Sequence, residues 1–450
     1  MNLVNFFKSG VDKPLIEDKQ EVDRLYRKHR ISVMLAITLG YGVVYTCRLA
    51  LSVVKKPLID GNIFSAEELG IIGSAIFYTY AFGKLTNGFL SDHANIRKFF
   101  AFGVLVSALI NLMMGISSTI LWIWVILWAL NGWFQGFGAP SGIVTLTSWF
   151  SNRERGRFYG IWSTAHSIGE GLTFVLVAAF VTWFGWRGGF IGPAILCILA
   201  AVGIYTLLQD RPRTLGLPTV AEWKNDHGNP VKGADGQPLK TWKTQLFIFK
   251  LPAIWVLGLA SATTYVTRYA INSWGILYLQ EAKGYSLVEA GGILGLNTVS
   301  GIVGCLAYGY ASDKLFNARR PPVTLIFGLI EIVALFIIFF APPGQPILLM
   351  FAFVMYGFSM NGLVTTLGGL FATDIAPKKA AGAVMGVIGV FSYLAAATQE
   401  RISGYLIQKG MTLVEGVRYY DFTTVIYFWV GASIISLILA TSLWNAKYSE

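Results

Sequence analysis

Residues 31–54 read ISVMLAITLGYGVVYTCRLALSVV, an apolar run that contains a single charged residue, Arg48. About 20 predominantly apolar residues are enough for a helix to cross the hydrocarbon core of a bilayer. The run therefore predicts a membrane-spanning helix with an arginine well inside it. Because a charge at that depth costs roughly 2.5 to 3.5 kcal/mol on insertion scales, such a residue usually faces a polar cavity or a partner.

The whole chain shares this apolar character. Of its 450 residues, 54% are apolar and 13% are charged, and the mean hydropathy is +0.58. Soluble proteins contain about 25% charged residues, so the composition excludes a soluble globular fold and a disordered chain. We predict an all-α integral membrane protein with twelve transmembrane helices, for which the lipid bilayer is the solvent. Its apolar stretches begin near residues 31, 69, 98, 120, 157, 188, 252, 288, 322, 346, 380 and 422.

The placement of the 35 lysines and arginines predicts the orientation in the membrane. Twenty-five of them lie in the two termini and in alternate loops, six lie in the opposite loops, and four lie within spans. Since cytoplasmic loops carry an excess of Lys and Arg, we expect both termini to lie in the cytoplasm and the protein to reside in the cytoplasmic (inner) membrane. The net charge of +11 is then a topology signal, and no nucleic-acid partner is expected.

One long polar segment, residues 209–250, divides the predicted spans into two groups of six. The expected organisation is a cytoplasmic N-terminus (1–30), a six-helix half (31–208), a cytoplasmic linker (209–250), a second six-helix half (251–445) and a cytoplasmic C-terminus (446–450).

Three landmarks recur in the two halves at a nearly constant offset. They pair Tyr45–Arg48 with Tyr265–Arg268, Ser91-Asp92 with Ser312-Asp313, and Arg153–Gly160 with Lys379–Gly386. This recurrence predicts duplication of a six-helix unit. An even number of spans in each unit leaves the two copies parallel, as in transporters whose halves are related by an axis along the membrane normal.

Arg48 and Arg268 occupy matched places in the repeat, and each has a tyrosine three residues earlier, Tyr45 and Tyr265. Duplicated halves should make the two arginines face each other across a central cavity. Two guanidiniums with no evident counter-ion suit the oxygens of a carboxylate or phosphate. We therefore predict a binding site for an anionic small molecule, although each arginine could instead pair with a buried carboxylate for structural reasons.

Other polar residues within spans are weaker candidates. Lys84 lies in the middle of a span and could bind substrate or form a structural pair. His166 and Glu170 are one helical turn apart and could form a protonatable pair, because imidazole titrates near neutral pH. The sequence assigns no role to Glu331, and a structural role is preferred for Glu400 and Arg401.

No catalytic motif accompanies these residues. The chain contains no paired carboxylates, catalytic triad or nucleotide-binding loop, so we expect neither enzymatic activity nor a cofactor. Cys47, Cys197 and Cys305 lie inside apolar stretches and form no CxxC pair. Neither a disulfide framework nor a metal site is therefore predicted.

Several longer motifs accompany the two arginines. They are Tyr45-Thr46-Cys47-Arg48, Tyr80-Ala81-Phe82-Gly83-Lys84, Asn131–Gly136, Trp162-Ser163-Thr164-Ala165-His166, Asp210-Arg211-Pro212, Gly216-Leu217-Pro218, Ser312–Phe316 and Pro377–Gly382. Taken together, the chain resembles the organophosphate:inorganic phosphate antiporters of the major facilitator superfamily, which include hexose-phosphate, glycerol-3-phosphate and phosphoglycerate carriers.

The resemblance implies that Arg48 and Arg268 bind phosphate, with contributions from Lys84 and His166. It also implies exchange of a phosphorylated metabolite for inorganic phosphate by alternating access. The chain differs from the family pattern at Leu49, Ser163, Ser167, Glu170, Ser273 and Thr298.

Two other functions remain open. One is a proton-coupled carrier of organic anions such as carboxylates, which would use His166 and Glu170. The other is a membrane sensor that binds sugar phosphate and signals to a sensor kinase, because the hexose-phosphate branch that the chain resembles contains such receptors.

Overall fold

A computed structural model describes residues 6–226, 248–317, 319–371, 375 and 381–446. The ends of the predicted termini, residues 227–247 of the predicted linker, and most of the motif Pro377–Gly382 lie outside these residues. The first part of the chain forms α2 (Lys19–Asp60), α3 (Ala66–His93), α4 (Ile96–Ile116), α5 (Leu121–Gln135), α6 (Gly138–Trp149), α7 (Asn152–Leu207), η1 (Pro212–Leu215) and α8 (Val220–Lys224).

The second part of the chain is also helical, with one short hairpin. It forms η2 (Ile248–Lys250), α10 (Pro252–Lys283), α11 (Leu287–Tyr310), η3 (Ala311–Leu315), α12 (Arg320–Phe340), α13 (Pro346–Thr365), η4 (Thr366–Leu370), α15 (Ala381–Lys409), β1 (Met411–Val414), β2 (Val417–Tyr420) and α16 (Thr423–Ser442). The strands β1 and β2 pair antiparallel around Glu415 and Gly416, both with positive φ. The hairpin is an addition to the predicted all-α fold.

Seven helices within the described residues are long and apolar enough to cross a membrane. This number cannot be compared directly with the twelve predicted spans, because one helix can contain more than one span. The 56-residue α7 contains two predicted spans and reverses at Gly185, whose φ is 68°. A left-handed backbone of this kind is open to glycine without steric cost.

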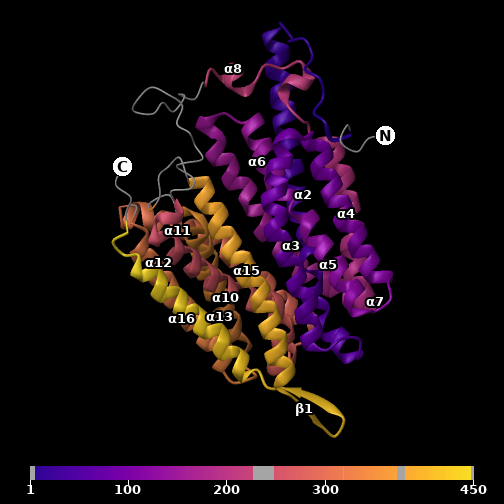
Figure 1. The fold of residues 1–450 in the computed structure, drawn as a ribbon, viewed down its shortest axis with the longest axis vertical. Coiled ribbons are helices and arrows are strands. Elements are labelled where there is room, and N and C mark those ends of the chain that lie inside the picture. Colours follow the sequence, from indigo (N-terminus) through magenta and orange to yellow (C-terminus); the bar gives the residue numbers. More distant parts are fainter. Residues whose placement is uncertain (1–5, 227–247, 318, 372–374, 376–380, 447–450) are drawn as a thin grey trace.

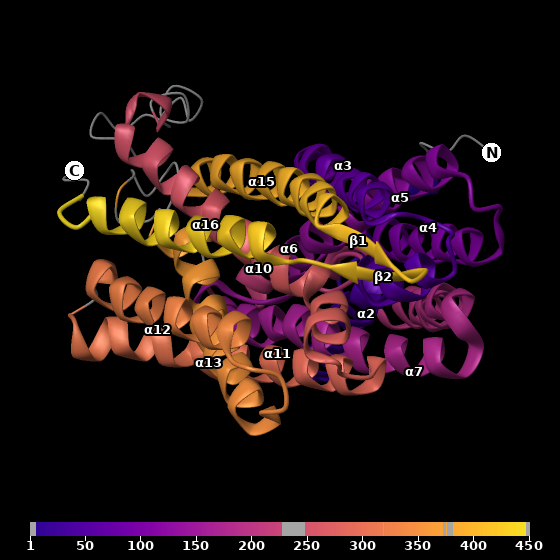
Figure 2. The same cartoon turned by 90° about the horizontal axis from the view of Figure 1, so that it is seen from below.

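The helices form two bundles that lie side by side, α2 to α7 in one and α10 to α16 in the other (Figure 1). Three pairs of helices join the bundles: α3 packs along α15, α11 packs along α7, and α2 packs against α10. Figure 2 views the same arrangement from the end that carries the hairpin. A twofold axis between the bundles would exchange the first two pairs and retain the third, as expected of duplicated halves.

We name the two ends of the molecule after what lies there. The termini face carries α8 and the start of α2, and the hairpin face carries β1 and β2 at the opposite end (Figure 1). α2 connects the two faces, because Tyr26 near its start donates to the carbonyl of Pro218 and Ile59 near its end accepts a hydrogen bond from Arg418.

The outside of the bundles is apolar along the helices. Leu199 on α7, Leu306 on α11 and Tyr427 on α16 are each more than 60% exposed. Soluble monomers rarely expose apolar patches of this extent, so these side chains are placed to contact lipid. Polar side chains, including Arg48 and Arg268, are buried between the helices instead.

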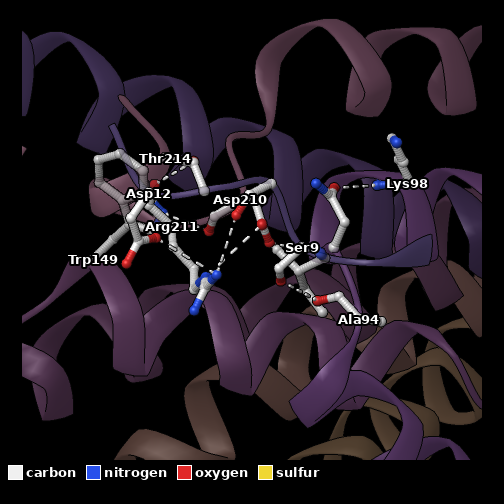
Figure 3. A network of polar contacts seen from close by, with 11 residues as sticks. Ser9, Asp12, Ala94, Lys98, Trp149, Asp210, Arg211 and Thr214 are labelled. Atoms are coloured by element: carbon white, nitrogen blue, oxygen red, sulfur yellow. Dashed lines mark hydrogen bonds and ion pairs between the residues drawn. The ribbon is translucent and has the colours of Figure 1, made fainter. Parts of the chain in front are cut away.

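The first part of the predicted linker packs on the termini face of the first bundle. The Asp210 carboxylate accepts a hydrogen bond from the backbone N–H of Ile96 at 3.0 Å. The backbone carbonyl of Asp210 accepts a second one from the Trp149 indole at 3.3 Å. Figure 3 shows this network, in which Arg211 also reaches Asp12 and the Ser9 hydroxyl donates to the carbonyl of Ala94. In addition, Lys98 Nζ donates to the carbonyl of Phe6 at 3.0 Å. Residues 209–226 are therefore attached to the first bundle rather than free.

The short helix α8 fastens this segment to α2. The rings of Trp223 and Tyr26 stack with centroids 4.0 Å apart, and the Trp223 indole donates to Asp23 at 2.6 Å. The pKa of Glu222 is lowered, because its carboxylate accepts hydrogen bonds from Thr219 and lies near Arg213. The termini face thus has a folded cap on the first bundle.

Candidate functional site

Arg48 lies on α2 in an aromatic box. Its guanidinium carbon is 4.1 Å from the ring centre of Tyr80, 5.2 Å from that of Tyr45 and 5.7 Å from that of Tyr393. Aromatic faces attract cations through their quadrupole, which explains how a side chain only 4% exposed keeps its charge. Among the described residues, no carboxylate lies within ion-pair distance of Arg48, so its positive charge is not neutralised.

Arg268 on α10 has a counter-ion. Its guanidinium donates from Nη2 to Glu170 Oε2 at 2.9 Å, and Asn272 donates from Nδ2 to Glu170 Oε1 at 2.7 Å. The expectation of two arginines without a counter-ion is therefore wrong for Arg268. The reason is tertiary: Glu170 on α7 is 98 residues away in sequence and meets Arg268 only where α7 and α10 approach each other.

The predicted pairing of His166 with Glu170 is not formed in this conformation. Both Glu170 oxygens bind groups on α10, while His166 Nε2 lies 3.2 Å from the Ser167 hydroxyl. His166 remains within electrostatic range of Arg48, Arg268 and Glu170. A guanidinium is always charged, so its hydrogen bond to a carboxylate is stronger than that of a neutral imidazole. Glu170 therefore binds Arg268 rather than His166.

A cavity of about 380 Å³ opens between α3, α6 and α15 on the side of the termini face. This volume is within the range of small-molecule sites. The exposed side chain of Lys84 lies on its wall, with Nζ 5.8 Å from the ring centre of Tyr393. The lining includes Ala81, Lys84, Asp92, Pro140, Ile143, Gly389 and Tyr393.

Neither Arg48 nor Arg268 lines this large cavity. The prediction that the two arginines face each other across a central cavity is therefore wrong for this conformation. Tyr393 lines the cavity, and its ring packs against that of Tyr80 with ring centres 4.7 Å apart. Both rings lie next to the Arg48 guanidinium. Arg268 borders a separate void of about 10 Å³, room for a single water. An anion entering the cavity would therefore meet Lys84 before it met either arginine.

A layer of tyrosines connects the two arginines. Tyr265 on α10 lies 5.5 Å from Tyr393 and 6.0 Å from Tyr269, measured between ring centres. Tyr45 and Tyr269 are each within electrostatic range of both Arg48 and Arg268. The predicted residues Arg48, Tyr45, Tyr265, Arg268 and Lys84 are thus brought into one cluster at the interface between the bundles.

Comparison with known proteins identifies this arrangement. A family model described as Major Facilitator Superfamily matches residues 37–398. The chain belongs to the major facilitator superfamily. A bacterial homolog of the human lysosomal transporter Spinster, solved in an inward-facing and unoccupied conformation, has a TM-score of 0.74 at 16% identity, covering 94% of this chain and 99% of that one. This likeness confirms the predicted fold.

Two curated relatives place the chain more narrowly within the superfamily. It is 33% identical to "Membrane sensor protein UhpC" of Salmonella typhimurium (strain LT2), over 97% of both chains. It is 32% identical to "Probable hexose phosphate transport protein" of Chlamydia pneumoniae, over 96% of this chain and 94% of that one. This major facilitator chain is therefore a member of the organophosphate:inorganic phosphate antiporter family, as its motifs predicted.

A further ion pair between the bundles of this major facilitator chain, Lys55 with Glu400, does not follow from the pattern of predicted spans. Lys55 is one of the six basic residues that the predicted topology places in the opposite loops, but α2 continues to Asp60 and Lys55 is fully buried. Its ammonium lies 3.1 Å from Glu400 on α15, 2.8 Å from the Ser273 hydroxyl and 3.3 Å from the centre of the Trp274 ring. Its position directly after Val53 and Val54 was the available signal that the helix continues.

The remaining charged residues within spans lie outside the cluster. Arg401 is exposed on the outer side of α15. Glu331 on α12 is 3% exposed, and its Oε1 has no hydrogen-bond partner among the described residues. Neither side chain is placed by a contact with the arginines, so neither enters the candidate site.

Proposed function

We propose that this protein is a secondary transporter that moves a phosphorylated small metabolite, of the sugar phosphate or glycerol phosphate class, across the inner membrane in exchange for inorganic phosphate. The proposal rests on one observation: Arg48 is buried and its charge is not neutralised by a carboxylate of the described residues. Arg268 occupies the matching position in the other half. A guanidinium offers paired N–H donors that match phosphate oxygens. The chain and these two relatives belong to one family of organophosphate carriers, which supports a phosphorylated metabolite as the substrate.

In this proposal, Arg48 and Arg268 hold the phosphoryl group from the two halves. Lys84 attracts the anion along the cavity wall, and His166, Tyr45 and Tyr265 contribute further hydrogen bonds. Tyr393 would have to shift for the anion to reach Arg48, because its ring both lines the cavity and lies next to the guanidinium.

The exchange cycle follows from the closed hairpin face. In the proposed orientation the termini face is cytoplasmic, so the cavity of this conformation receives substrate from the cytoplasm. On the hairpin side α3 and α15 are in backbone contact, since a Cβ at Gly70 would lie 2.6 Å from the carbonyl oxygen of Glu400. Rocking of the two halves about the central site would exchange the open and closed sides.

Transport in proteoliposomes tests the proposal. Vesicles loaded with inorganic phosphate should take up labelled glucose-6-phosphate or glycerol-3-phosphate, whereas vesicles without internal phosphate should not. Uptake that needs no internal phosphate and collapses with a protonophore would instead show a proton-coupled organic-anion carrier that uses His166 and Glu170.

A second candidate function is sensing of sugar phosphate, favoured by the 33% identity to a protein named as a membrane sensor. A sensor would use the same cluster to bind ligand and would signal to a sensor kinase. Tight binding of glucose-6-phosphate without flux in proteoliposomes would favour this function over transport.

A further inference from the structure

Glu170 brings a negative charge into the cluster of Arg48, Arg268 and Lys84, which are all positively charged. Asp92, which also lines the cavity, is exposed and lies about two helical turns beyond Lys84 on α3. Its side chain is 5% exposed, and both of its oxygens accept hydrogen bonds from α10, one from Arg268 and one from Asn272. The carboxylate is therefore held in one place by two donors. It cannot turn toward water without leaving Arg268 unpaired.

Three cations share this region. Arg48 and Lys84 are each within electrostatic range of Tyr80, and His166 is within range of Arg48, Arg268 and Glu170. With His166 neutral, the cluster of Arg48, Lys84 and Arg268 has a surplus of two positive charges once Glu170 is counted. The exposed Asp92 is not counted, because it lies eight residues, or about 12 Å, farther along α3 than Lys84. A buried site of low dielectric penalises any net charge, so this surplus matches a ligand with two negative charges.

We propose that Glu170 selects substrates by charge: it makes a phosphomonoester dianion with an uncharged remainder the matched substrate, and it disfavours phosphomonoesters that also carry a carboxylate. This inference rests on the proposed transport of organophosphates. A phosphomonoester carries close to two negative charges above its second pKa of about 6, and an added carboxylate makes three. The third charge would remain unbalanced in the site and would be repelled by Glu170.

A purely structural role would leave charge selection unchanged. Glu170 does connect the two halves, but so does Glu400, whose carboxylate is fully buried against Lys55. Glu400 is not among the residues that line the cavity or the void at Arg268. The two glutamates thus form a matched pair of interface carboxylates, one inside the proposed site and one outside it.

The test uses two pairs of substrates that differ mainly by one carboxylate. These are glycerol-3-phosphate with 3-phosphoglycerate, and glucose-6-phosphate with 6-phosphogluconate. Exchange into phosphate-loaded proteoliposomes at pH 7.5 gives kcat/KM for each. The wild type should prefer the dianion of a pair about tenfold, the effect expected of one unit charge about 12 Å away at an effective dielectric near 20.

Glu170→Gln keeps an oxygen that can accept from Arg268 but removes the charge. It should lower the preference about tenfold, to near equality. Glu170→Asp keeps the charge and should retain the preference, even if its rate falls. Glu400→Gln, the matched control, should also retain it.

Three outcomes would overturn the inference. They are equal transport of both members of a pair by the wild type, an unchanged preference in Glu170→Gln, or the same change in Glu400→Gln. The wild-type result decides even if Glu170→Gln does not fold. Failure of the folded wild type to exchange any of the four compounds would instead contradict the proposed function itself.

Discussion

The ammonium of Lys55 lies 3.1 Å from the carboxylate of Glu400, and both side chains are fully buried where the two halves meet. The residues are 345 positions apart in the chain. Ser273 and the Trp274 ring complete the surroundings of the ammonium. Because Lys55 belongs to the first half and Glu400 to the second, the pair must separate if the hairpin face opens.

Removing one partner of this pair should be far more damaging than removing both. Lys55→Met or Glu400→Gln alone leaves a buried charge without a partner, which costs about 3 to 5 kcal/mol. We expect each single variant to melt at a clearly lower temperature in detergent. The double variant Lys55→Met/Glu400→Met should recover most of the loss, because buried ion pairs are often replaceable by apolar residues. Additive losses in a double-mutant cycle would contradict this coupling.

The two site arginines should tolerate no replacement by lysine. Arg48→Lys or Arg268→Lys keeps the charge but loses the planar fork that matches phosphate oxygens. We expect kcat/KM for phosphate exchange in proteoliposomes to fall about 100-fold, a loss of roughly 2.7 kcal/mol. Arg401→Lys, at an exposed position on α15, is the control and should exchange normally. Normal exchange by either site variant would rule out the arginine clamp.

The ring of Tyr80 should contribute more to its effect on Arg48 than does its hydroxyl, which is also within hydrogen-bonding range of Arg48 and Tyr393. The ring centre is 4.1 Å from the guanidinium carbon, and a desolvated contact of this type contributes about 2 kcal/mol. Tyr80→Leu should lower kcat/KM for phosphate exchange about 30-fold, since each 1.4 kcal/mol corresponds to a factor of ten. Tyr80→Phe should stay close to wild type. A loss in Tyr80→Phe equal to that in Tyr80→Leu would assign the effect to the hydroxyl.

The cap on the termini face should be released by one substitution. Trp223→Ala removes the stacking on Tyr26 and the hydrogen bond to Asp23. Because cleavage needs local opening of the backbone, trypsin should cut after Arg213 and Lys224 several times faster than in the wild type. Trp183→Ala, at a position that is 70% exposed, should not change the cleavage rate. Unchanged cleavage in Trp223→Ala would show that other contacts hold the segment.

The local sequence was enough to predict which segments are apolar helices, because burial in lipid requires only a continuous apolar run. It also identified Arg48 and Arg268, since a charge in such a run is conspicuous and the duplicated unit repeats it. Boundaries were less predictable. Lys55 follows an apolar run directly, and only its contact with Glu400 explains why the helix can continue through a charged residue.

What the sequence determined by itself is therefore the membrane class, the repeat, the family and the positions of the two arginines. The tertiary structure alone decided how those charges are compensated: Glu170 pairs with Arg268, aromatic rings surround Arg48, and Lys55 pairs with Glu400. The physical reason is distance along the chain. Apolarity and helical period act between neighbouring residues, whereas a buried charge takes its partner from whichever helix packs beside it.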